Sequence, residues 1–219
     1  MPTPKERLSH LLELAAQGAA ERAALAGEVA DLLLDWPAEY PATTRATFAA
    51  LLEKIVREMD EPAQAALALR LEGRNDFPLS LLNELFLVAP DGMKDALLAR
   101  NNAVLGVRRQ IVNSDALLEA ARNTANFAPA LSRALSIPLA LVTRILTDRS
   151  GRALAAICRG AGINRASFSA IMILAGPVRA VHQNFAMLSV YDRVPENGAA
   201  NLIAYWQSRS DQPAIVRAA

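Results

Sequence analysis

The chain has few of the residues from which catalytic and metal sites are usually built. Its 219 residues include one cysteine, two histidines and only 5% aromatic residues. A single cysteine excludes an internal disulfide and a zinc site made of several cysteines, and it is typical of a reducing compartment. No Gly-rich phosphate loop followed by Lys-Ser or Lys-Thr is present. We therefore expect no metal, no cofactor and no catalytic activity.

Long apolar runs are also missing. The longest apolar stretch, residues 166–178, is interrupted by two serines, a glycine and a proline. A membrane-spanning helix needs about 20 predominantly apolar residues. The opening Met-Pro-Thr-Pro-Lys-Glu-Arg has an early acid and no continuous apolar segment, so no signal peptide is expected. Together these observations predict a cytoplasmic protein without a membrane partner.

Helical periodicity is what the chain has in abundance. Apolar residues recur at the spacing of one helix face from Leu25 to Trp36 and from Phe48 to Met59. Thr43 or Thr44 is the expected N-cap of the second helix, and Pro62 suits the first turn of a third. No segment alternates with a period of two for long enough to predict a strand. The expected fold class is all-α.

A weak internal repeat suggests how these helices are organised. The segment Phe77–Leu85 aligns with Ile137–Ile145, 60 residues later, and a looser third copy begins at Ile163. Recurring pairs of short helices predict stacked antiparallel helical hairpins of the HEAT or armadillo kind, because one pair cannot bury its apolar face alone. An irregular helical bundle is the alternative. We expect a helical-repeat domain over residues 1–176 and a C-terminal helical cap over 177–219, packed on the same domain.

Two segments carry a family resemblance. The run from Leu146 to Phe168, LTDRSGRALAAICRGAGINRASF, and the earlier unit PLSLLNEL ending at Leu85 are both rich in Leu and Ala. They resemble the bacterial domain-of-unknown-function 2336 family, from about Leu8 to about Met172. The resemblance implies an all-helical, HEAT-like fold and supplies no catalytic residues.

The charges are divided unevenly along the chain. Residues 1–99 contain 9 Lys/Arg against 16 Asp/Glu, whereas residues 100–219 contain 14 Arg, no Lys and 6 acids. Such an asymmetry indicates a charged partner for one half, or the opposite half of another copy. We expect an acidic protein partner, with a homo-oligomer as a further possibility.

The basic half places several arginines on one predicted surface. On a helix over about 150–160, the apolar stripe that includes Leu154 and Ile157 leaves Arg152 and Arg159 projecting outward on the opposite face. Guanidinium groups bind phosphate and carboxylate with two parallel hydrogen bonds. We therefore predict a non-catalytic protein-interaction or regulatory module that binds an acidic or phosphate-bearing partner through Arg149, Arg152, Arg159 and Arg165. A solvated face that serves only solubility is the alternative for these four residues.

The same region also resembles a DNA-binding helix-turn-helix. Over residues 151–174 a short helix, a turn containing Gly162 and a second helix follow one another. In a DNA-binding regulator, the second helix would enter the major groove. The residues expected to read bases are Asn164, Arg165, Ser167 and Ser169. Any tight αα-hairpin produces this pattern, and nucleic acid is therefore the less favoured partner.

An enzyme with an unrecognised pocket is the second alternative. His182 lies between apolar residues and has the chemistry of a general base, although a helix-surface position is the simpler interpretation. His10 is expected on the surface of the first helix. Cys158 lies on an apolar stripe and is interpreted as a small buried residue; the neighbouring Arg159 would favour a reactive thiolate instead.

Overall fold

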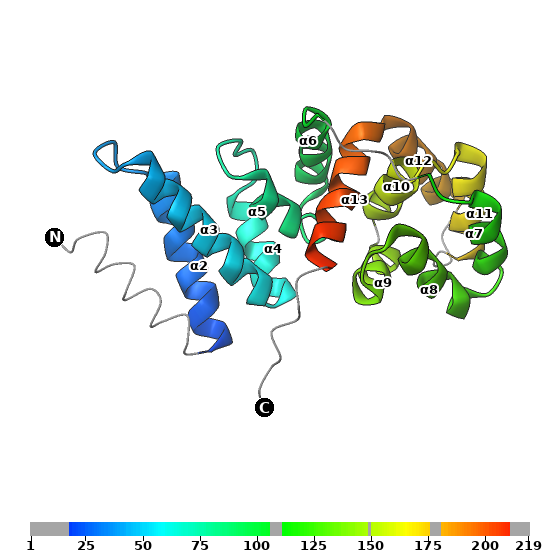
Figure 1. Ribbon diagram of the computed structural model, residues 1–219, viewed down its shortest axis with the longest axis horizontal. Coiled ribbons are helices and arrows are strands. Elements are labelled where there is room, and N and C mark those ends of the chain that lie inside the picture. Colours follow the sequence, from blue (N-terminus) through cyan, green and yellow to red (C-terminus); the bar gives the residue numbers. More distant parts are fainter. Residues whose placement is uncertain (1–17, 106–110, 149, 176–180, 211–219) are drawn as a thin grey trace. The chain divides into compact units, whose positions relative to one another are not determined.

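The structure, a computed structural model, describes residues 18–105, 111–148, 150–175 and 181–210 (Figure 1). These residues form twelve helices and no strand, so the predicted all-α class is confirmed. None of the helices described is both long and apolar enough to cross a membrane.

The chain divides into two compact units, residues 1–93 and 94–219. The helices that follow residue 176 pack on α10 (Arg152–Gly160) and α11 (Arg165–Leu174), within the second unit. A domain boundary at residue 176 stays a prediction. The charge asymmetry follows the observed boundary. The first unit contains 8 Lys/Arg against 15 Asp/Glu, and the second contains 15 against 7.

The described part of the first unit contains four complete helices, coloured blue to cyan in Figure 1. They are α2 (Ala19–Leu34), α3 (Ala42–Glu58), α4 (Glu61–Arg70) and α5 (Leu79–Glu84). Helix α2 packs on α3 and α4, and α3 also packs on α5. Both predicted apolar stripes face this core, with Leu25, Val29, Phe48 and Leu52 buried.

The helix starts in this unit follow from capping chemistry. Asp60 is the N-cap of α4, and its carboxylate accepts a hydrogen bond from the backbone N–H of Ala63 at 2.9 Å. Pro62 lies in the first turn, as predicted, where its missing N–H leaves no hydrogen bond unmade. The prediction of Thr43 or Thr44 as the N-cap of α3 is wrong. The extended backbone of Pro41 (φ −61°) starts this helix at Ala42.

The second unit contains the remaining helices, which are green to red in Figure 1. Helix α6 (Asp91–Asn102) begins just before the boundary. It is followed by α7 (Ser114–Ala121), α8 (Thr124–Leu135), α9 (Leu139–Thr147), α10 (Arg152–Gly160), α11 (Arg165–Leu174), α12 (Val181–Arg193) and α13 (Glu196–Ser210). Helix α10 packs on α9, α12 and α13, while α11 packs on α7 and α12.

The two best copies of the predicted repeat begin in the same way. Pro78 and Pro138 are the N-caps of α5 and α9, with φ of −55° and −58°. In each, the proline carbonyl accepts the first helical hydrogen bond, from Leu82 or from Val142. Their packing differs, because α5 lies on α3 whereas α9 lies on α8 and α10. A HEAT-like stack of such hairpins stays a prediction.

Candidate functional site

Helix α10 is buried on nearly all sides. Seven of its nine residues are buried, and only Arg152 and Arg159 are partly exposed. Small residues make this possible: a Cβ atom on Gly160 would lie 2.7 Å from the backbone carbonyl carbon of Ala199 in α13. Neighbouring helices therefore approach α10 closely. The predicted single apolar stripe is narrower than the buried surface that the structure shows.

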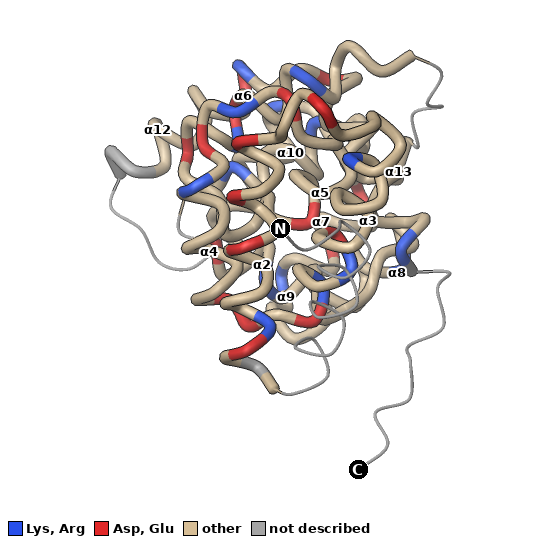
Figure 2. Tube along the Cα trace, turned by 90° about the vertical axis from the view of Figure 1, so that its left-hand side faces the viewer, with Lys and Arg blue, Asp and Glu red and all other residues tan. Residues whose placement is uncertain are grey.

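The predicted arginines that the structure describes all have partners within the second unit. Each pairs with a carboxylate on another helix: Arg152 with Asp95, Arg159 with Glu196 and Arg165 with Asp192. In Figure 2, basic and acidic segments accordingly lie near one another around α6 and α12. Arg149 lies outside the described residues. A role for these arginines in partner binding stays a prediction.

The three pairs differ in how far they are withdrawn from solvent. Arg152 donates from Nε and Nη2 to the two carboxylate oxygens of Asp95, at 3.0 and 3.3 Å, and its side chain is only 15% exposed. It does not project outward as predicted. Arg165 is 58% exposed and contacts Asp192 through Nε at 3.0 Å. Arg165 is therefore the most accessible of the three.

Arg159 is held by an aromatic side chain as well as by Glu196. Its guanidinium carbon lies 5.1 Å from the centroid of the Tyr191 ring, and a hydrogen bond with Tyr191 raises the pKa of Arg159. Tyr191 is itself buried, stacks on Phe168 and donates its hydroxyl to the carbonyl of Ile163. Arg159 therefore forms part of the contact between α10, α11 and α12.

The residues predicted to read DNA are mostly engaged elsewhere. Asn164 is the N-cap of α11, and its side-chain oxygen accepts a hydrogen bond from the backbone N–H of Ser167. Ser167 is buried and Ser169 is partly buried. Because α11 packs on both α7 and α12, Ser167 does not lie on a face that could enter a groove. Asn164 and Arg165 are both exposed, but the side-chain oxygen of Asn164 accepts the cap hydrogen bond and Arg165 is paired with Asp192.

A buried ion pair fixes the turn between α9 and α10. Lys94 Nζ lies 3.4 Å from a carboxylate oxygen of Asp148, and the two side chains are 4% and 10% exposed. Asp148 also accepts hydrogen bonds from the backbone N–H groups of Ser150 and Ala153 and from the Ser150 hydroxyl. The turn is thus tied to α6 at Lys94, beside the pair that Asp95 makes with Arg152.

Of the residues weighed for the enzyme hypothesis, the structure describes the side chain of Cys158 alone. Cys158 is fully buried, as predicted, and burial raises the pKa of its thiol, so the reactive thiolate is disfavoured. His10 lies outside the described residues. His182 belongs to α12, but the position of its side chain is also outside what the structure describes. In the described residues no group of three potential metal ligands occurs.

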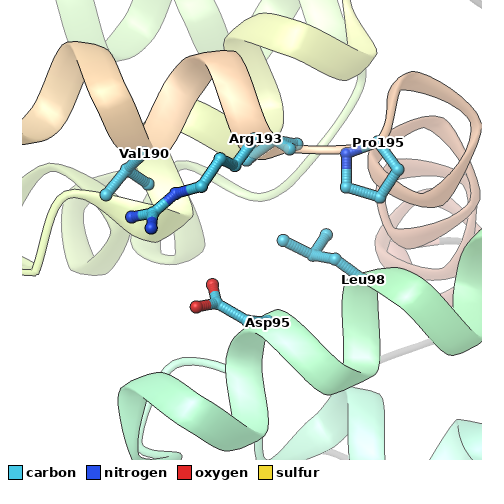
Figure 3. Close-up of a pocket in the computed structure, with 6 residues that line it drawn as sticks. Asp95, Leu98, Val190, Arg193 and Pro195 are labelled. Atoms are coloured by element: carbon cyan, nitrogen blue, oxygen red, sulfur yellow. The ribbon is translucent and has the colours of Figure 1, made fainter.

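A small cleft opens between α6 and the junction of α12 and α13. Its volume is about 150 Å³, and its walls are Asp95, Leu98, Val190, Arg193, Val194 and Pro195. Figure 3 shows the guanidinium of Arg193 and the carboxylate of Asp95 facing one another across the cleft. Leu98 and Pro195 lie together at the other end. The cleft therefore has a polar end and an apolar end.

Arg193 differs from Arg152, Arg159 and Arg165 in having no carboxylate partner among the described residues. Its side chain is exposed, and no carboxylate of the described residues forms an ion pair with it. Asp95, across the cleft, is already bound by Arg152 at 3.0 Å. Together, the side chains of Arg193, Arg152 and Asp95 carry a net charge of +1. The arrangement is suited to binding an anionic group that lies beside an apolar one.

Neither Arg193 nor Asp95 was identified as a site residue from the sequence. Arg193 follows Asp192 near the end of a helix, which is an ordinary position for a basic residue because it complements the helix dipole. Asp95 is 57 residues from its partner Arg152. The clearest sequence signal was the excess of arginine in the second half of the chain.

Comparisons with known proteins assign neither a family nor a function. No family model, no curated protein and no solved structure matches the chain. The resemblance to the domain-of-unknown-function 2336 family stays a prediction.

Proposed function

We propose that the chain is a non-catalytic interaction module whose second unit binds an acidic partner protein. The observation that carries this proposal is Arg193, an exposed guanidinium with no ion pair among the described residues, at the polar end of a cleft whose other end is apolar. An anionic group that reaches Arg193 does not have to displace a carboxylate of the chain. At Arg152, Arg159 and Arg165 it would have to compete with one.

The charge of the second unit supports the same proposal. An excess of eight positive charges by sequence attracts acidic partners at long range and speeds their association. Because exposed charges are screened by salt, the affinity is expected to fall as ionic strength rises. A cytoplasmic location fits the single, buried cysteine.

Replacing Arg193 by glutamine tests this function. We expect the affinity for fluorescein-labelled poly-L-glutamate to fall about three- to tenfold, because one charge-assisted hydrogen-bonding site is lost. Fluorescence anisotropy at low salt measures the effect.

The matched control is Arg133→Gln, which removes the same charge from the same unit. Arg133 is exposed and lines a different, open groove between α7 and α8, where its Nε donates to the carbonyl of Pro129 at 3.4 Å. Arg133→Gln is expected to lower the affinity less than twofold. Equal losses in the two variants would mean that only net charge matters, and the proposed site would be wrong.

A second copy of the chain is an acidic partner that the two units themselves suggest. The first unit has an excess of seven negative charges and the second an excess of eight positive charges. We expect dimers or larger assemblies in native mass spectrometry at about 20 mM ammonium acetate, and monomers at about 500 mM, because the Debye length shortens severalfold over this range. An oligomer that is unchanged across the series would contradict association by charge.

A further inference from the structure

The cleft beside Arg193 is too small for most cofactors and drug-sized ligands. Its volume of about 150 Å³ is below the roughly 300–1,000 Å³ of typical small-molecule pockets. An apolar cavity of about this volume accepts a group the size of benzene. The cleft therefore suits one amino-acid side chain of a partner.

The groups around the cleft match the three substituents of one particular kind of residue. Arg193 offers a cation, Asp95 offers a hydrogen-bond acceptor opposite it, and Leu98 and Pro195 provide an apolar wall at the other end (Figure 3). A C-terminal aliphatic residue has an anionic carboxylate, a backbone N–H and an apolar side chain, all attached to one Cα atom. Resting on the proposed function, we infer that the cleft binds the C-terminal residue of a partner chain, with an aliphatic side chain.

In this arrangement each polar group has a defined partner. The terminal carboxylate accepts hydrogen bonds from Arg193, and the N–H of the same residue donates to Asp95. Arg152 holds the Asp95 carboxylate in place through two hydrogen bonds, at 3.0 and 3.3 Å. The acceptor is therefore fixed before the ligand binds, which reduces the entropy lost on binding.

The carboxylate of Asp95 also discriminates between anions. A phosphate group carries nearly two negative charges at neutral pH, whereas a terminal carboxylate carries one. Asp95 therefore repels a phosphate on Arg193 more strongly than it repels a carboxylate. A phosphate has no N–H to offer Asp95 in return. The cleft thus favours a peptide C-terminus over a phosphorylated side chain.

Three short peptides test this inference with the full chain. The probes are N-acetyl-Gly-Gly-Leu with a free carboxylate, the same peptide as its C-terminal carboxamide, and N-acetyl-Gly-Gly-Gly with a free carboxylate. Titrations are followed by the backbone amide resonances of the 15N-labelled protein, which detect millimolar affinities. The expected shifts are those of Asp95, Leu98, Val190, Arg193 and Val194.

The free acid with leucine is expected to bind at least about fivefold more tightly than its carboxamide, because a charge-assisted contact is lost in the latter. It is also expected to bind about tenfold more tightly than the glycine peptide, because the leucine side chain is buried. Arg193→Gln is expected to abolish the preference for the free acid, and Arg133→Gln is expected to preserve it. Inorganic phosphate is expected to shift these resonances less than the free acid does.

Each other result has a distinct meaning. Equal binding of the acid and the carboxamide, a stronger response to phosphate, or shifts that map outside the cleft would overturn the C-terminal assignment. If Arg193→Gln still weakens polyglutamate binding in that case, the proposed function stands without this ligand. If Arg193→Gln weakens neither, both proposals are wrong.

Discussion

Replacing Asp148 by alanine is expected to lower the free energy of unfolding of the second unit by about 3–5 kcal/mol. The change leaves the ammonium group of Lys94, a side chain that is only 4% exposed, without its carboxylate partner. It also removes the acceptor for the backbone N–H groups of Ser150 and Ala153 at the start of α10. The unpaired buried charge and the two lost hydrogen bonds both lower the stability of the folded unit.

The two tryptophans allow each unit to be followed separately. Trp36 lies in the first unit, and Trp206 is buried in α13 of the second. In a Trp36→Phe background, urea unfolding followed by tryptophan fluorescence reports on the second unit alone. We expect Asp148→Ala to shift this transition to lower urea concentration.

Lys94→Met is the matched control for this prediction. It removes the other half of the pair but keeps a side chain of similar length, and Asp148 keeps its three hydrogen bonds from Ser150 and Ala153. We expect a smaller loss than in Asp148→Ala, because the Asp148 carboxylate keeps these hydrogen bonds after its cation is removed. If the two variants destabilise the unit equally, Asp148 acts only through its charge and not through the turn. A loss below about 1 kcal/mol in Asp148→Ala would refute the importance of the pair.

The helices were predictable because the interactions that define them are local. The spacing of Leu25, Val29 and Leu33 lies within one helix, and the hydrogen bond from Ala63 to Asp60 spans three residues. The wrong prediction of Thr43 as an N-cap also has a local cause, because a threonine and a nearby preceding proline can each start the same helix. Pro41 does so without any side-chain hydrogen bond.

The candidate site was not predictable, because its pairs join distant segments. Arg152 and Asp95 are 57 residues apart, and Arg165 and Asp192 are 27 apart. Helical phase assigns Arg152 to the polar side of α10, but it does not reveal that α6 places a carboxylate there. The sequence therefore shows that the second half is rich in arginine. Which of these arginines are exposed and unpaired can be seen only once the fold is known. Arg193 is exposed and unpaired among the described residues, and Arg152 is not.

Gly198→Ala is expected to destabilise the second unit by about 1–3 kcal/mol, although alanine favours a helix by about 0.5–1 kcal/mol over glycine. A Cβ atom at this position in α13 would lie 2.1 Å from the backbone carbonyl oxygen of Leu98 and 3.1 Å from Pro195 Cγ. Because a backbone atom cannot rotate away, α6 and α13 must separate. The same urea experiment in the Trp36→Phe background measures the loss.

Gly27→Ala provides the contrast for Gly198→Ala, since its Cβ would meet only the end of the flexible Arg70 side chain, at 2.9 Å. We expect the first unit, followed through Trp36 in a Trp206→Phe background, to be unchanged or stabilised by up to about 1 kcal/mol.

Because Leu98 and Pro195 form the apolar end of the cleft, Gly198→Ala should also weaken binding of N-acetyl-Gly-Gly-Leu under conditions where the unit stays folded. Unchanged stability in Gly198→Ala would show that the contact between α6 and α13 yields at little cost. If the variant is destabilised but its peptide affinity is unchanged, the distance between α6 and α13 does not determine binding in the cleft.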